Sequence, residues 1–348
     1  MNAMNLIPIP DPIPVAWGWF EGLGILTFAL HIALANVLVG GGMLALYLKL
    51  RGGSDGTAEA VSVRLPTVFA LTVNLGVAPL LFLQVIYGHF FYVSATLSAV
   101  WWLSIVVLLI LGYYAMYINQ FKVKAARPGG GLFLGAGTIM TLFIALVLTN
   151  VLTMMARPEA WTEYFNNPGG TMLNLLEPTL VPRFLHFVFA SLAVGGLFAA
   201  LLAHFGKGTP EGLTKGMKMF TTATMLQMAT GVWWLFVLDR PVMLRFMGDS
   251  GPATALLVIA VVLTFPALSA GFRQKPLAAA GWLMAAILAM SGVRAVVRSA
   301  TLEPFFSPGS LTVTGEMSPL ILFLVTLAIG LAVVAYMVRI GFNTQEEG

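Results

Sequence analysis

The feature that most constrains this chain is a series of long apolar stretches separated by short connections. A helix needs about 20 apolar residues to cross the roughly 30 Å of hydrocarbon in a bilayer. We therefore predict an all-α, polytopic membrane bundle of nine helices in one integral domain, residues 17–340, with an outer surface segment, 1–16, and an inner tail, 341–348. The predicted spans are about 17–48, 66–87, 100–121, 131–155, 181–205, 217–238, 253–272, 277–297 and 317–340.

Composition agrees with a membrane protein and excludes several kinds of site. Only 9% of the residues are charged, against about 25% in ordinary soluble domains. The absence of cysteine excludes disulfides, thiolate metal sites, iron–sulfur clusters and covalently attached c-type haem. The net charge of +4 is small and gives no nucleic-acid signal. The start of the chain has no basic region before its first apolar stretch, so we expect no removable signal peptide.

The distribution of basic residues predicts the orientation of the bundle. With the N-terminus outside, twelve of the 18 Lys and Arg residues, including every lysine, fall on the inner side. This bias indicates an N-out, C-in topology. Nine of the 14 acidic residues fall on the outer side, which would suit a basic partner there. The outer basic residues are all arginines, namely Arg157, Arg183, Arg240, Arg245, Arg294 and Arg298.

Histidines are the residues with the clearest potential for chemistry. His31, His89 and His186 belong to the first, second and fifth predicted spans or their outer ends, whereas His204 lies at the inner end of the fifth. An imidazole in hydrocarbon is costly without a partner, so each is a candidate functional residue. Without cysteine, three outward histidines on different helices are what a bundle that binds b-type haem would need. The alternatives are a hydrogen bond to a neighbouring helix and, for His89 and His204, an interfacial position.

Glycines and arginines near these histidines allow two interpretations each. Gly40, Gly41 and Gly42, Gly76, and Gly195 and Gly196 would let either a flat macrocycle or a neighbouring helix approach the backbone. Arg183 precedes His186 by three residues, on the same helix face, where it could meet a haem propionate. Arg294 and Arg298 share a face at the outer boundary and could clamp propionates or lipid phosphate. Met225 and Met228 are spaced as core residues, with thioether ligation as the alternative.

The block LLEPTLVPRFLHFVFASLAVGGLFAALLAHFGKG resembles the corresponding part of subunit I of the cytochrome bd quinol oxidases. FALHIALANVLVGGG resembles that family's first helix, and LGVAPLLFLQVIYGHFF the end of its second. The resemblance implies that His186 ligates a low-spin b haem and that His31 is an axial ligand in a second haem site. It also implies nine spans, one to three b haems, contact with the quinone pool, and a place in a bacterial or archaeal cytoplasmic membrane.

Several features of that family are missing here. The third span, WWLSIVVLLILGYYAMYI, has no acidic residue, and Gln84 lies near a position where the family has glutamate. A short connection, DRPVMLRFMGDSG, replaces the long quinol-binding loop. The seventh span lacks the methionine that the family uses as second ligand to the low-spin haem. We therefore predict that His89 replaces it opposite His186.

The leading hypothesis from the sequence is a b-haem subunit of a respiratory complex. It would relay electrons between the quinone pool and an outer, periplasmic c-type cytochrome or another redox subunit. A divergent quinol oxidase that reduces oxygen is the second hypothesis, and a haem-free membrane anchor for outer cytochromes is the third. A transporter lacks support, because no pair of broken helices with an intramembrane carboxylate is visible. The sequence shows no internal repeat on inspection.

Overall fold

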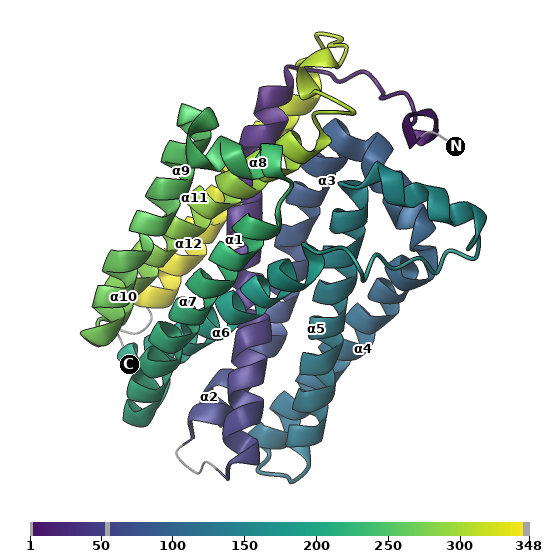
Figure 1. The fold of residues 1–348 in the computed structure, drawn as a ribbon. Helices are drawn as coiled ribbons and strands as arrows, with labels where there is room; N and C mark the ends of the chain where they lie inside the picture. The colour runs from purple at the N-terminus through teal and green to yellow at the C-terminus, as the bar shows by residue number, and fades with distance from the viewer. Residues whose placement is uncertain (1–2, 53–55, 344–348) are drawn as a thin grey trace.

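The computed structural model describes residues 3–52 and 56–343, and these are almost entirely helical (Figure 1). An isolated bridge between Ile13 and Val313 is the extent of β pairing among them. The predicted inner tail begins inside the last helix, and its residues 344–348 lie outside the described part. The long helices are α1 (Trp17–Leu50), α3 (Leu65–Leu97), α4 (Ala99–Lys124), α5 (Gly130–Met155), α6 (Leu180–His204), α7 (Pro210–Val237), α9 (Gly251–Val262), α10 (Thr264–Phe272), α11 (Pro276–Leu302) and α12 (Ser318–Asn343).

Seven helical segments of the described chain are long and apolar enough to cross a membrane. This finding supports a multi-pass membrane protein. Helix α7 has a suitable length of 28 residues but carries Lys215 and Lys218 in its first half, and the described apolar part of α12 is the shorter segment Ser318–Gly330. The seven segments are Trp17–Leu50, Thr57–Leu97, Ala99–Lys124, Gly130–Met155, Leu180–His204, Gly251–Phe272 and Pro276–Leu302.

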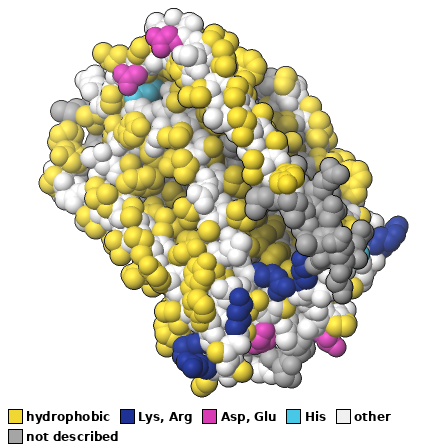
Figure 2. All heavy atoms as spheres, turned by 180° about the vertical axis from the view of Figure 1, so that it is seen from behind, with side chains coloured by type: hydrophobic (Ala, Val, Ile, Leu, Met, Phe, Trp, Pro, Cys, Tyr) yellow, Lys and Arg dark blue, Asp and Glu magenta, His cyan; other side chains and the backbone are white. Residues whose placement is uncertain are grey.

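The bundle has two distinct ends, which we call upper and lower after Figure 1, with α1 beginning at the upper end. The short helix α2 (Thr57–Ser62) lies at the lower end. Figure 2 shows that apolar side chains cover most of the face turned away in Figure 1, and that its Lys and Arg side chains lie in the lower half.

Helices α1 and α6 pack in parallel through small residues at their centres. A Cβ added at Gly40 would lie 1.6 Å from the backbone oxygen of Ser191, and one added at Gly195 would lie 2.2 Å from the carbonyl carbon of Gly40. Four residues before this glycine contact, Ser191 donates a hydrogen bond of 2.9 Å to Asn36. The members of both contacting pairs are 155 residues apart in the chain. Equivalent positions therefore meet at one line between the helices, as at a two-fold axis.

The spacing of 155 residues also relates the segment that packs on α1 to the segment that packs on α6. A Cβ at Gly41 would meet Val61 and Leu65, and one at Gly196 would meet Gly216 and Phe220, the positions 155 residues further on. The packing of α2 and α3 on α1 is therefore repeated by α7 on α6. The expectation of no internal repeat was wrong: the chain contains a parallel repeat, of the kind whose axis runs along the membrane normal.

Two local predictions also need correction. The second span does not end near residue 87, because α3 continues to Leu97 across a kink at Tyr87, whose φ and ψ are −120° and 20°. His89 therefore lies within a helix and not after one. The outer connection holds Trp161, Tyr164 and Phe165, and aromatic residues there are predicted at the headgroup level. Trp161 is instead 1% exposed and donates its indole N–H to the Met154 carbonyl, whereas Tyr164 and Phe165 are exposed.

Candidate cofactor site

His186 is fixed between α6 and α7 by a backbone hydrogen bond. Its Nδ1 lies 3.0 Å from the Gln227 carbonyl oxygen. Because a carbonyl only accepts, Nδ1 carries the proton and Nε2 has the free lone pair. The side-chain amide nitrogen of Gln227 lies 3.4 Å from Nε2, where it can donate. The imidazole fills a notch at Gly231, since a Cβ there would lie 3.1 Å from Cε1 of His186.

His31 has the equivalent environment between α1 and α3. Its Nδ1 lies 3.0 Å from the Thr72 carbonyl oxygen, 41 residues along the chain, the same separation as between His186 and Gln227. A Cβ at Gly76 would lie 2.8 Å from Cε1 of His31, so this imidazole also fills a glycine notch. The repeat thus contains two histidines with the same tautomer. Each is held by a backbone carbonyl of the next helix, and in each the unprotonated nitrogen is Nε2.

Each histidine also has an aromatic ring and an arginine beside it. The Trp234 ring lies 6.0 Å from that of His186, and Arg183 lies 5.5 Å from the Trp234 ring centre. On the other side, Phe28 lies 6.5 Å from His31, and Arg294 lies 4.1 Å from the Phe28 ring centre. The arginine of the His186 group comes from its own helix, α6, whereas that of the His31 group comes from α11.

The glycines of the helix centres serve packing and not a macrocycle slot. Gly40 and Gly195 bring α1 and α6 together, and a Cβ at Gly42 would lie 2.6 Å from the Thr138 hydroxyl of α5. Gly76, also predicted as part of a slot, is filled by His31. Of the two interpretations that the sequence left open, close helix packing is therefore the one that these contacts support.

His89 belongs to a different cluster from His186. Its ring lies 4.4 Å from Phe90 and 4.6 Å from Phe306, in an apolar group that also contains Trp161. Its Nε2 is buried and has no hydrogen-bond partner. The ring contact of His186 is Trp234, which is not among these neighbours, so the pairing of His89 with His186 stays a prediction.

The remaining candidate ligands are His204, Met225 and Met228. His204 is exposed at the lower end of α6 and contacts Phe205 at 5.2 Å. Met225 is 47% exposed, so its predicted place in the core was wrong. Met228 accepts a hydrogen bond from the Thr264 hydroxyl at 3.7 Å. The described residues contain no cluster of three or more His, Asp or Glu that could hold a metal ion.

A cavity at the upper end, which we call the arginine cavity, collects four of the six outer arginines. It is lined by residues of α5, α6, α7 and α11 and of the connection after α5, among them Thr153, Arg157, Arg183, Trp234, Arg294 and Arg298. Arg157 pairs with Glu177 and with Asp239. Burial alone would lower the pKa of Arg157, but these carboxylates raise it above its ordinary value. Arg298 pairs with Glu21 at 2.6 Å.

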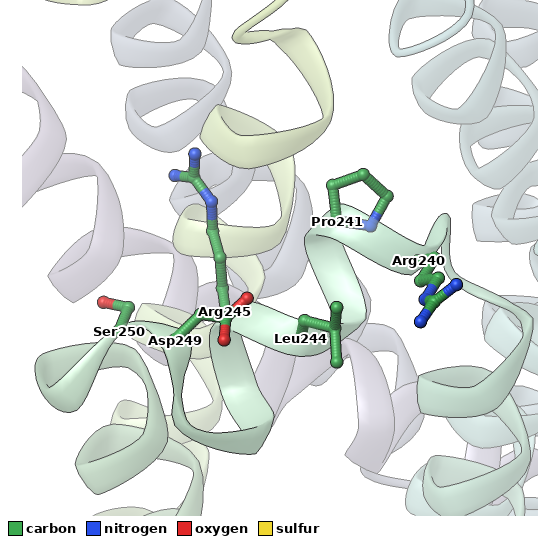
Figure 3. Close-up of a pocket in the computed structure, with 6 residues that line it drawn as sticks. All are labelled: Arg240, Pro241, Leu244, Arg245, Asp249 and Ser250. Carbon is green, nitrogen blue, oxygen red and sulfur yellow. The ribbon is translucent and has the colours of Figure 1, made fainter.

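A second hollow, an open groove of about 510 Å³, lies in the connection between α7 and α9 (Figure 3). It is formed by α8 (Arg240–Leu244), the π turn Arg245–Asp249 and the start of α9. Arg245 pairs with Glu303 beyond the end of α11, and this hydrogen bond lowers the pKa of the Glu303 carboxyl. Neither the groove nor the arginine cavity is lined by a histidine.

Comparisons of the chain with protein-family models, with curated proteins and with solved structures found no match. The likeness to cytochrome bd subunit I therefore stays a prediction from the residues quoted above. Sequence reasoning missed Thr72, Gln227 and Trp234. The first two act through backbone carbonyls, which leave no signal in the side-chain sequence, but Trp234 could have been found, since it lies one turn from Gly231 and faces the same neighbour.

Proposed function

We propose that this protein is a b-haem subunit of a membrane electron-transfer complex. The observation that carries the proposal is the repeated histidine, His31 and His186, whose Nδ1–H donates to a backbone carbonyl of the next helix. Histidines that ligate a metal usually anchor their second nitrogen in this way, which fixes the ring and directs the other lone pair at the metal. Two such residues in a chain without cysteine favour two b haems over any other resident group.

The donor chemistry of the two residues fits a haem. Each offers a neutral Nε2, the form that binds iron. The imidazoles sit in the notches at Gly76 and Gly231, so a porphyrin would lie on the Nε2 side of each ring and not against these glycines. On the His186 side the Gln227 amide would have to give way, since it lies 3.4 Å from Nε2. When bound, haem iron would supply one-electron transfer at each position.

The partners follow from the resemblance and from surface charge. We place the protein in a nine-span, N-out arrangement, receiving or delivering electrons at the quinone pool and at an outer c-type cytochrome. Five acidic residues of the predicted outer side form no ion pair in the described chain, and they would attract a basic cytochrome. These residues are Asp11, Glu159, Glu163, Asp249 and Glu316.

The decisive experiment counts haem in the purified protein and three variants. A dithionite-reduced minus oxidised spectrum and a pyridine haemochrome count should show b-type haem in the wild type and no d-type band. His31→Ala and His186→Ala should each lose about one haem, because each removes one axial nitrogen. His204→Ala is the matched control and should retain both, since this residue is exposed at the opposite end of α6.

The variants must keep their fold for this comparison to count, so size-exclusion profile and helix content are measured beside the spectra. An unchanged haem spectrum in His186→Ala would contradict the proposal. Rapid reduction of the bound haem by a short-chain quinol, and its reoxidation by a c-type cytochrome, would then test the two partners separately.

A haem-free anchor is the second candidate, and one observation favours it. Both imidazoles are already satisfied at Nδ1 and packed against glycine, as a histidine that only joins two helices would be. The same spectrum separates the two functions, because a correctly folded wild type without a Soret band would support the anchor.

A further inference from the structure

The arginine cavity carries more positive charge than its own carboxylates neutralise. Arg157 has two acidic partners and Arg298 has one. Arg183 and Arg294 have no carboxylate partner among the described residues; instead they lie over Trp234 and Phe28. Arg183 also contacts the Thr153 hydroxyl, at 3.4 Å, but a hydroxyl brings no negative charge.

These two charges also repel each other and Arg298. Arg294 has unfavourable Coulomb interactions with Arg183 and Arg298 and a smaller favourable one with Glu21, which is already paired with Arg298. Arg183 and Arg298 also repel each other. Neither Arg183 nor Arg294 is exposed, so water screens this repulsion poorly. Removing charges from water without an opposite charge is expensive. An arrangement with two guanidiniums that face one cavity, without a carboxylate bonded to either, becomes more stable when an anion binds between them.

The size of the cavity limits what that anion is. Its volume is about 40 Å³, roughly three times the 10–15 Å³ that one water needs by the same kind of measure. A carboxylate or phosphate group fits this space, and a whole ring system does not. Guanidinium forks bind the paired oxygens of both groups, often with two parallel hydrogen bonds.

We propose that the arginine cavity is a binding site for an oxyanion, a carboxylate or phosphate group, held between Arg183 and Arg294. The site follows from the charges and the cavity and does not depend on the haem proposed above. That haem would be one source of the group, through a propionate, and a membrane phospholipid the other, through its phosphate. Arg157 and Arg298 serve the site indirectly, since their own carboxylates keep them in place.

Inorganic phosphate is the first probe. The full-length protein, purified in detergent and freed of lipid and haem, is titrated with phosphate against chloride at equal ionic strength while its thermal midpoint is followed. Phosphate should raise the midpoint of the wild type. Arg183→Gln and Arg294→Gln should each weaken the apparent affinity about tenfold, the usual effect of losing a charge-assisted hydrogen bond. Arg240→Gln removes an exposed arginine of the same end and should leave the affinity unchanged.

Two further measurements identify the source of the group. If it is a lipid phosphate, mass spectrometry of the intact protein from membranes should find a bound phospholipid in the wild type and in Arg240→Gln but not in Arg183→Gln. If it is a propionate, lipid content will be equal and the reduction potential of the bound haem will fall in Arg183→Gln. Should Arg183→Gln fail to fold, Arg183→Lys replaces it in these measurements. Lysine keeps the positive charge but lacks the planar guanidinium that makes two parallel hydrogen bonds.

A wild type whose midpoint ignores phosphate, and whose lipid content and haem potential are both unchanged in the arginine variants, would overturn the site. Arginine variants that are more stable than the wild type and bind phosphate equally well would also overturn the site. The two charges would then destabilise the fold without binding an anion. Neither result touches the haem count, which tests the proposed function separately.

Discussion

Gly40→Val should prevent the stable assembly of the bundle. The added Cβ would lie 1.6 Å from a backbone oxygen of α6, and backbone cannot move aside as a flexible side chain does. Overpacking a core usually costs about 1–3 kcal/mol, and this clash at the centre of the α1–α6 contact should exceed about 3 kcal/mol. Unfolding in detergent, followed by helix content against rising denaturant, measures the loss directly.

Gly22→Val is the matched control, because Gly22 is on the same helix and nothing lies within 4 Å of an added Cβ. Its unfolding midpoint should stay close to that of the wild type. Equal stabilities for the two variants would show that α1 and α6 do not meet at their glycines. Gly195→Val, the change at the equivalent position of the repeat, should be about as damaging as Gly40→Val.

Arg298→Met should destabilise the protein by about 2–4 kcal/mol, through the loss of its ion pair with Glu21. The two side chains are only 14% and 15% exposed and lie 2.6 Å apart, so the change leaves a carboxylate largely buried without a partner. The expected loss is somewhat below the about 3–5 kcal/mol of fully buried pairs, because some exposure remains. Arg298 also stacks over Tyr87, at 4.7 Å, and that contact is lost as well.

Arg245→Met gives the comparison, since the Arg245–Glu303 pair of the same end is 36% and 58% exposed. Exposed pairs contribute about 0–1 kcal/mol, so this variant should be nearly as stable as the wild type. Adding Glu21→Gln to Arg298→Met should recover part of the loss, because the unpaired charge is then gone. A double variant less stable than Arg298→Met alone would mean that the two residues do not act as a pair.

The helices of this fold could be predicted from sequence because hydropathy and length suffice to locate them. The helix bounds erred where no residue stops a helix: after Tyr87 the run HFFYVSATL is still apolar, and α3 continues through it to Leu97. The histidines of α1 and α6 could also be singled out, since a polar ring in an apolar stretch is conspicuous. Their hydrogen bonds could not, because the acceptors are main-chain carbonyls of helices 41 residues away.

The repeat escaped inspection for a related reason. Its two copies share a histidine and a glycine pair at matching positions, but most of the residues between them differ, as Asn36 and Ser191 do. What the copies conserve is the contact geometry: the small residues meet at one line, and the rings pack against Gly76 and Gly231. The sequence nevertheless carries a signal, because Leu30, Ala35 and Val39 recur 155 residues later as Leu185, Ala190 and Val194. A comparison of the chain with itself at this offset would have found the repeat.

The parallel packing of α1 and α6 determines how the two histidines lie relative to each other. His31 and His186 each precede the contacting pair Asn36 and Ser191 by five residues, so they lie at the same height along the α1–α6 pair, one on its α3 side and the other on its α7 side. We therefore expect the same depth for both in a membrane that the pair crosses upright. Moving one charge across the whole membrane costs or yields about 2.3 kcal/mol per 100 mV. An electron passing between groups held by these two residues would instead travel parallel to the bilayer plane. That step would do no electrical work, so its rate should not respond to membrane voltage.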